Sequence, residues 1–185
     1  MSPDSSPPAK ARGRVASRVV VRPLVQEDRS AVLSIVTRAG NFSAEEIAVA
    51  MELVDEWLTD GEASGYLTLV LEDLDRPEHP VRGYVCVGPT PLTDGTFDLY
   101  WIAVDPEDQG RGFGQRLLAA AEDVVRGRGG RLLLIETASH DAYSATVRFY
   151  ERAGYPLVAR IEDYYRPGED KLVFGKRLGP QPLRR

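Results

Sequence analysis

The chain has few residues of the types that build disulfides and metal sites. It contains one cysteine, Cys86, and two histidines among 185 residues. A single cysteine excludes an intrachain disulfide and any metal site made of several cysteines, and it suits a reducing compartment. No spacing of histidine, cysteine or acidic residues indicates a metal site. We interpret Cys86, which lies in an apolar run, as a small buried hydrophobic residue and expect no bound metal.

Long hydrophobic runs and an excess of positive charge are also missing. The formal net charge is −5, with 23 lysines and arginines against 28 aspartates and glutamates, which argues against broad binding to nucleic acid. No stretch is apolar enough for a secretory signal. The sequence therefore predicts a cytoplasmic protein that binds neither nucleic acid nor membranes. We expect a disordered tail over residues 1–17, one domain over 18–178 and a C-terminal tail over 179–185.

Hydrophobic periodicity predicts a mixed α/β domain with an antiparallel front half and a parallel crossover. One helix start is marked by a capping box, Ser43 with Glu46 three residues later. The predicted strands cover 19–22, 66–72, 81–87, 97–104 and 131–136, the predicted helices cover 26–39, 43–58, 115–126 and 144–155, and a hairpin within 160–178 closes the chain.

A glycine-rich turn joins the strand 97–104 to the helix 115–126. Gly110, Gly112 and Gly114 occupy alternate positions there. A turn of this kind presents free backbone N–H groups and the positive end of a helix dipole, so it predicts a phosphate or diphosphate ligand. The alternative is a tight turn without a ligand.

The spacing of these glycines excludes two common phosphate motifs. A dinucleotide fingerprint needs a third glycine at position 115, which is Gln115, and no Gly-Lys-Ser/Thr tripeptide follows for a P-loop. The pattern present is Q-x-x-G-x-G, formed by Gln109, Gly112 and Gly114 directly after V-D-P. It resembles the acetyl-CoA-binding motif of the GNAT superfamily of N-acetyltransferases.

The resemblance extends from Val19 to Leu178. The segment SATVRFYERAGY, residues 144–155, resembles the helix of that family that ends in F-Y-E-x-x-G-F/Y, and residues 160–178 resemble its closing hairpin. The resemblance implies the GNAT fold, a mixed seven-stranded sheet flanked by about four helices. It also implies an acetyl-CoA-dependent N-acetyltransferase without a metal.

The same resemblance implies where the donor binds. Strand 97–104 is expected to splay from its parallel neighbour, so that its free backbone groups bind the pantetheine arm and the thioester. Arg111 and Arg116 would add positive charge, or would simply be solvated. The expected donor-binding residues are Ile102, Ala103 and Val104 on the strand, and Gln109, Gly110, Arg111, Gly112, Phe113, Gly114 and Gln115 in the turn.

Acetyl transfer from a thioester to an amine needs an acid for the leaving thiolate and a base for the ammonium proton. Tyr150 stands where the family motif places the tyrosine that meets the CoA sulfur, and its alternative role is a core tyrosine. Glu136 resembles in position the strand glutamate that accepts the ammonium proton through water. Its alternative role is structural, capping Ser139 or the following helix.

Three regions are candidates to bind the acceptor amine. The resemblance places Asn41 and Phe42 in a loop beside the acceptor, although a loop cap and a hydrophobic staple are equally good interpretations. Asp98 and Tyr100 share one face of a strand, and they are also second candidates for the base after Glu136. Because side chains alternate along a strand, Tyr100 and Trp101 should not both face the pocket.

The third region is the hairpin that contains Tyr164 and Tyr165. Its Y-Y-x-x-x-x-E-D pattern resembles the hairpin of enzymes that acetylate protein N-termini, and it is also a good turn around Pro167-Gly168. Many family members carry Asn and Ala where this chain has Tyr143 and Thr146, and the preceding loop is longer here. These departures favour a small primary amine or amino-acid derivative as acceptor.

Three alternatives to that function stay open. The first is a protein N-terminus as acceptor. The second is a noncatalytic acyl-CoA-binding module, and the third is a domain without a ligand. A homodimer formed through an exposed strand edge is a further hypothesis for partners.

Overall fold

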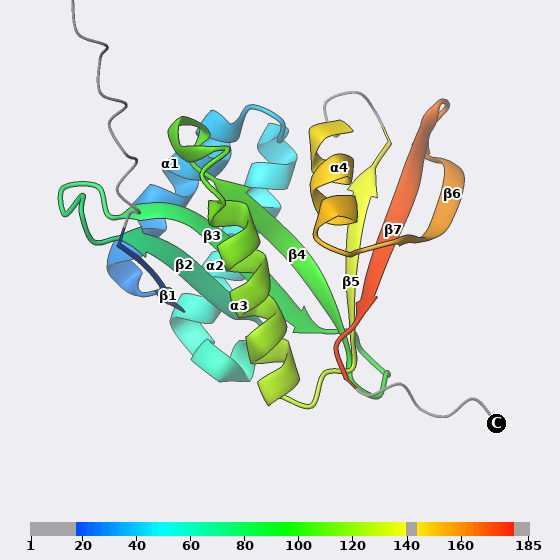
Figure 1. Cartoon of the computed structure of the whole chain (residues 1–185), viewed down its shortest axis with the longest axis horizontal. Helices are drawn as coiled ribbons and strands as arrows, with labels where there is room; N and C mark the ends of the chain where they lie inside the picture. Colours follow the sequence, from blue (N-terminus) through cyan, green and yellow to red (C-terminus); the bar gives the residue numbers. More distant parts are fainter. Residues whose placement is uncertain (1–17, 140–143, 180–185) are drawn as a thin grey trace, which may run out of the picture.

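The computed structural model describes residues 18–139 and 144–179 of the chain. Both predicted tails, except Gly179, lie outside the described residues, and so does Tyr143. One seven-stranded sheet runs in the order β1-β2-β3-β4-β5-β7-β6 and carries helices on both faces (Figure 1). The strands are β1 (Val19–Pro23), β2 (Leu67–Asp73), β3 (Val81–Pro89), β4 (Thr96–Val104), β5 (Leu132–Ala138), β6 (Leu157–Arg166) and β7 (Glu169–Arg177), and the helices are α1 (Arg29–Ala39), α2 (Ala44–Asp60), α3 (Phe113–Gly127) and α4 (Ser144–Arg152).

The predicted fold class and order of elements are confirmed. Strands β1 to β4 pair antiparallel in sequence order, and β4 pairs parallel with β5. The capping box also forms, because the N–H of Glu46 donates to Ser43 Oγ at 3.2 Å and the N–H of Ser43 donates to Glu46 Oε2 at 2.7 Å. Helix α4 ends at Arg152, three residues before the predicted boundary, because Gly154 turns the chain with a φ of +82°.

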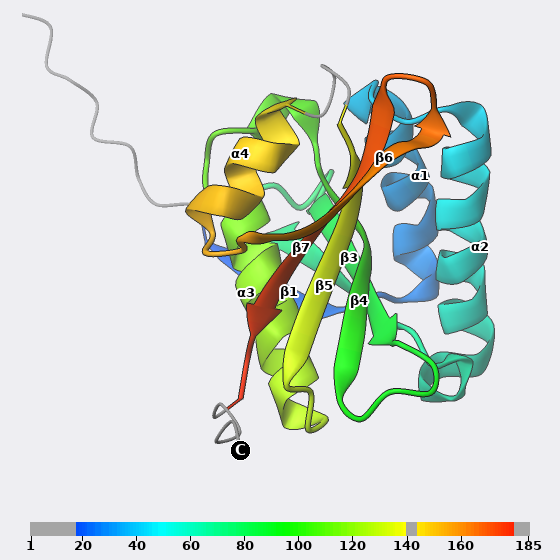
Figure 2. The ribbon, with the colours of Figure 1, turned by 90° about the vertical axis from the view of Figure 1, so that its right-hand side faces the viewer.

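The sheet separates two hydrophobic cores. Figure 2 shows α1 and α2 on one face, and α3 and α4 on the other. Leu117 and Phe174 belong to the core on the α3 side, whereas Val54 and Cys86 belong to the core on the α1 side. Cys86 is fully buried, and burial raises the pKa of its thiol to about 12. The prediction that it is a buried apolar residue is confirmed.

The prediction that Tyr100 and Trp101 cannot share a pocket is wrong. Both side chains line the same cavity. The reason is a β-bulge, because Cys86 pairs with Trp101 and the next residue, Val87, pairs with Leu99. Tyr100 is thus an extra residue in β4 without a partner position on β3, and the alternation of side chains restarts after it.

Strands β4 and β5 separate along their length. Their parallel pairing runs from Thr96 with Leu132 to Leu99 with Ile135, and stops there although both strands continue. The carboxyl halves of the two strands therefore turn unpaired edges toward each other. This splay, expected from the family resemblance, is present.

Candidate active site

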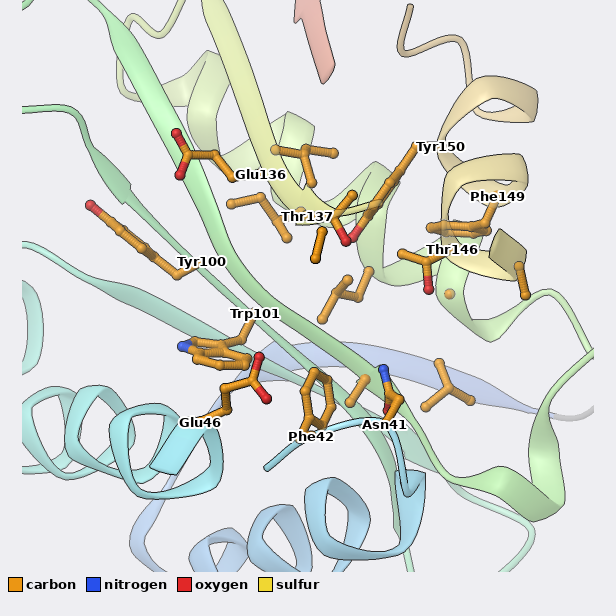
Figure 3. A pocket seen from close by; sticks show the side chains of 18 of the residues that line it. Asn41, Phe42, Glu46, Tyr100, Trp101, Glu136, Thr137, Thr146, Phe149 and Tyr150 are labelled. Atoms are coloured by element: carbon orange, nitrogen blue, oxygen red, sulfur yellow. The ribbon is translucent and has the colours of Figure 1, made fainter. Parts of the chain in front are cut away.

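A cavity of about 1260 Å³ lies at the splay between β4 and β5. Its walls come from segments far apart in the sequence: the loop between α1 and α2, the end of β4, the glycine turn, the end of β5, α4 and the β6–β7 hairpin. Figure 3 shows labelled side chains of the α1–α2 loop, α2, β4, β5 and α4 arranged around it. The cavity joins the predicted donor region to the predicted acceptor region.

The glycine turn forms one end of the cavity. A 3-10 turn, Pro106–Asp108, leads out of β4, and α3 begins at Phe113. Gly110 and Gly112 have φ values of +74° and +82°, which favour glycine strongly. The first N–H groups of α3, which no helix can pair internally, therefore lie at the cavity wall.

Gly114 has a different role, because it lets α3 approach α4. A Cβ at this position would lie 3.3 Å from the ring of Phe149. That is closer than ordinary van der Waals contact, so Gly114 brings the turn close to the helix that carries Tyr150.

Nearly all predicted donor residues line the cavity. Arg111 is the exception, because its guanidinium forms an ion pair with Asp108 and lies 4.8 Å from the centroid of the Phe113 ring. Arg111 therefore does not line the cavity, and its guanidinium is held against Asp108 and Phe113. The predicted donor residues that do line it are Ile102, Ala103, Val104, Gln109, Gly110, Gly112, Phe113, Gly114 and Gln115.

Tyr150 lies on α4 and lines the middle of the cavity. Its ring packs against Phe149, Tyr155 and Phe174, with centroid distances of 5.3, 6.5 and 5.8 Å. Figure 3 shows its hydroxyl end pointing from α4 into the cavity. The ring is thus held by the core while the hydroxyl reaches the site, an arrangement compatible with both predicted roles.

Glu136 lies at the end of β5, on the other face of the sheet from Tyr150. Its carboxylate forms an ion pair with Lys171 of β7 at 2.5 Å, and its side chain is 48% exposed. Burial opposes the charge of Lys171, but the hydrogen bond and charge of Glu136 outweigh burial and raise the lysine's pKa. Ser139 has another partner, because its hydroxyl accepts from the N–H of Asp170 at 2.8 Å.

Aromatic side chains line the half of the cavity predicted to bind the acceptor. Phe42, from the predicted loop, packs edge-on against Trp101 at a centroid distance of 5.4 Å. Tyr100 packs edge-on against Tyr66 at the same distance. Tyr165, on the hairpin, also lines the cavity, as do Asn41 and Glu46.

Two predicted acceptor residues lie outside the cavity wall. Asp98 accepts a hydrogen bond from Thr90 Oγ1 at 2.7 Å, and burial raises the pKa of its carboxyl. Tyr164 packs against Tyr165 at 4.9 Å and lies beneath the Lys171 ammonium, 4.9 Å from its ring centroid. Neither residue is among those that line the cavity, so the prediction that they contact the acceptor is not supported by the cavity.

Sequence reasoning missed two features of the site. Thr137, next to Glu136, lines the cavity, and its buried hydroxyl has no hydrogen-bond partner within residues 18–139 and 144–179. The alternation of β5 could have indicated it, since Thr137 follows Leu133 and Ile135 on the buried face. Lys171 was also missed, and only the pairing of Ala138 with Lys171 across β5 and β7 brings it to Glu136.

The described part of the chain holds no group of three or more histidine, cysteine or acidic side chains placed to bind a metal. Nor is any described helix both long enough and apolar enough to cross a membrane.

The chain is similar to known acetyltransferases. The family model of the GNAT acetyltransferases matches residues 32–155. A GNAT-family structure from Desulfovibrio desulfuricans is 44% identical with a TM-score of 0.82, and the match covers 87% of this chain and 99% of that one.

Two further acetyltransferases match with lower identity or over a shorter segment. The ribosomal-protein-S18-alanine N-acetyltransferase of Escherichia coli is 22% identical with a TM-score of 0.67, over 89% of this chain and 97% of that one. N-alpha-acetyltransferase 30 of Schizosaccharomyces pombe is 33% identical over 73 residues. That match spans 40% of this chain and 47% of the relative, so the chain covers about half of that protein's length.

Proposed function

Because the chain belongs to the GNAT family of acetyltransferases, we propose that it transfers the acetyl group of acetyl-CoA directly to a primary amine. The observation that carries the proposal is the continuous cavity that is lined by the glycine turn, by Tyr150 and by the aromatic side chains of the predicted acceptor half. A donor and an acceptor bound at its two ends would meet at the β4–β5 splay. No covalent enzyme intermediate is needed, and Cys86 is fully buried.

The donor would be held by backbone rather than by side chains. The N–H groups at the start of α3 would bind the diphosphate of acetyl-CoA. The unpaired edge of β4, at Ile102, Ala103 and Val104, would bind the pantetheine arm as a neighbouring strand would. This arrangement would put the thioester beside Tyr150.

The acetyl group would pass directly from the thioester to the amine. The neutral amine attacks the thioester carbonyl, a C–N bond forms, and the C–S bond breaks. Tyr150 gives its phenolic proton to the departing thiolate. The proton that the attacking nitrogen loses as the amide forms passes through water to Glu136. Because a phenol is in general a weaker acid than a thiol, the proton transfer from Tyr150 can occur only in concert with departure of the thiolate.

A small primary amine or amino-acid derivative is our first choice of acceptor. Phe42, Tyr100, Trp101 and Tyr165 would enclose its apolar part. A protein N-terminus is the second candidate, favoured by the Tyr164-Tyr165 hairpin and by the partial similarity to N-alpha-acetyltransferase 30. The cytoplasmic location and the homodimer expected from the sequence stay predictions.

Calorimetry with acetyl-CoA tests the donor half of the proposal. The informative variant is Gly112→Asp, which places a negative charge where the diphosphate should lie. Since Gly112 has a φ of +82°, any side chain there is strained, and Gly112→Asn is the matched control with similar shape and no charge. We expect micromolar binding by the wild type and a much larger loss for Gly112→Asp than for Gly112→Asn.

Absence of acetyl-CoA binding by the wild type would refute the proposed function. If the wild type binds, a screen of small amines and of short peptides with free N-termini separates the two acceptor classes. Binding without turnover on any acceptor would instead favour the noncatalytic module.

A further inference from the structure

A buried ion pair lies behind the glycine turn. Asp108, the residue immediately before the turn, is fully buried, and Arg82 of β3 is 5% exposed. The guanidinium of Arg82 donates to Asp108 Oδ2 through Nε, and its Nη2 forms an ion pair with the same oxygen. The other carboxylate oxygen faces two more guanidinium groups, that of Arg111 and that of Arg76, the latter at 3.4 Å.

Arg82 also reaches the start of the same connection. Its Nη2 lies 3.3 Å from Asp105 Oδ2, and its backbone carbonyl accepts from the N–H of Asp105 at 2.9 Å. Asp105 in turn accepts from the N–H of Glu107 through Oδ1 at 3.1 Å. One side chain therefore ties together both ends of the 3-10 turn that leads from β4 into the glycine turn.

A buried ion pair of this kind is an inefficient way to stabilise the fold. Removing a carboxylate and a guanidinium from water costs several kcal/mol each, and well-packed apolar residues often stabilise a core as much or more. Burial by itself would raise the pKa of the Asp108 carboxyl, but hydrogen bonds from Arg111 and Arg82 hold that pKa below its ordinary value. Asp108 is thus kept ionised, and its two oxygens accept hydrogen bonds in fixed directions.

The pair acts on the backbone that would bind the donor. Asp108 is covalently joined to Gln109, and Arg111, the third residue of the turn, is tied back to Asp108. A shift of the Asp108 carboxylate would therefore move both ends of the segment from Gln109 to Arg111. Hydrogen bonds from backbone N–H groups to a diphosphate depend strongly on distance and angle.

We propose that Arg82 and Asp108 are positioning residues that hold the glycine turn in the shape that receives the diphosphate of the donor. The inference rests on the proposed function. It differs from a general structural role in one respect: loss of the pair should weaken binding of donors that carry the diphosphate and spare donors that lack it.

The test compares two acetyl thioesters on two matched variants. Acetyl-CoA carries the diphosphate, whereas acetyl-pantetheine keeps the thioester arm without it. The variant is Arg82→Met. Its control is Arg22→Met, which removes a comparable pair, since Arg22 Nη1 lies 2.6 Å from the buried Asp28 and neither residue lines the cavity. Affinities come from calorimetry for acetyl-CoA and from NMR titration for acetyl-pantetheine, and folding is monitored by circular dichroism.

We expect Arg82→Met to weaken acetyl-CoA binding by about tenfold or more, because small displacements of binding groups are costly. Binding of acetyl-pantetheine should stay within about twofold of wild type, and Arg22→Met should leave both affinities unchanged. If Arg82→Met does not fold, Arg82→Lys is tested in its place. This variant keeps the positive charge but lacks the planar guanidinium group that contacts both Asp105 and Asp108.

Three results separate the possibilities. Equal weakening of both donors by the folded Arg82 variant would overturn the positioning role, and so would unchanged binding of acetyl-CoA. A wild type that binds no acetyl-CoA would refute the proposed function itself, before the variants are compared.

Discussion

Glu136 Oε2 lies 2.5 Å from the ammonium of Lys171, across the neighbouring strands β5 and β7. The glutamate lines the cavity, and the lysine is the more buried partner. A carboxylate that receives a proton during turnover would therefore do so next to a permanent positive charge.

Glu136→Gln should lower kcat by about 10- to 100-fold if Glu136 receives the ammonium proton. The affinity for acetyl-CoA should stay within about twofold, since the donor half is untouched. The same change removes the group that raises the pKa of Lys171, so burial should then lower that pKa. NMR titration of the Lys171 side chain checks the second effect, and unchanged kcat would contradict the role of Glu136.

Tyr150→Phe should reduce kcat by about 100-fold or more while acetyl-CoA affinity is retained. The reason is that the ring keeps its packing and only the proton donor is lost. Tyr155→Phe is the matched control, because the Tyr155 hydroxyl donates to Glu122 at 3.0 Å in the core. It should lower the unfolding temperature and leave kcat nearly unchanged. Steady-state kinetics with the best acceptor from the screen measure kcat, and thermal melting measures the unfolding temperature of each variant. Equal losses of kcat in the two variants would argue against the acid role.

Gly114→Ala should impair catalysis through crowding rather than through backbone strain. The new methyl group would lie 3.3 Å from the Phe149 ring and would push α4, with Tyr150, away from the turn. We expect kcat/KM to fall about tenfold or more. Phe149→Leu in the Gly114→Ala background should recover part of that loss, and failure of the smaller side chain to rescue would contradict the steric explanation.

The stability of the fold should depend on pH through Glu122. Burial opposes its charge, but hydrogen bonds from Lys176, Tyr155 and Arg126 outweigh burial and lower its pKa. A pKa lowered by folding contributes stability above the unfolded-state value of about 4.3, and that contribution is lost as the pH falls through the folded-state pKa. Glu122→Gln should therefore cost about 1–3 kcal/mol at pH 7 and much less near pH 3.

Urea unfolding at the two pH values measures this difference. Asp123→Asn is the control, because Asp123 is an exposed partner of the same Arg126, at 2.8 Å. It should change the free energy of unfolding by no more than about 0.5 kcal/mol at either pH. A Glu122→Gln penalty that is equal at both pH values would contradict the assignment to Glu122.

Local patterns in the sequence were sufficient for most of the fold. The Ser43 capping box, the V-D-P turn before Gln109 and the alternation of the strands depend on neighbours within a few residues, and such neighbours are readable from the sequence. The glycine turn was predictable for the same reason, because positive φ values and close approach require glycine.

The parts that were not predicted depend on pairing between distant segments. Glu136 meets Lys171 only through the register of β5 and β7, and Arg82 meets Asp108 only when β3 lies beside the end of β4. The wrong prediction that Tyr100 and Trp101 cannot both face the pocket has the same origin. A bulge arises in the pairing of two strands and cannot be recognised from the sequence of one strand.

The bulge at Tyr100 also bears on how the acceptor pocket can change in evolution and in engineering. Without Tyr100, Leu99 and Trp101 would be consecutive and would point to opposite faces, so β4 would be a regular strand with every core residue on its present side. Tyr100 is thus an insertion that adds an aromatic group to the pocket without displacing any core residue. Insertion or deletion at this one position therefore offers a route to new acceptor preferences that leaves the hydrophobic core intact. Substitution of Trp101, which packs against that core, would disturb it.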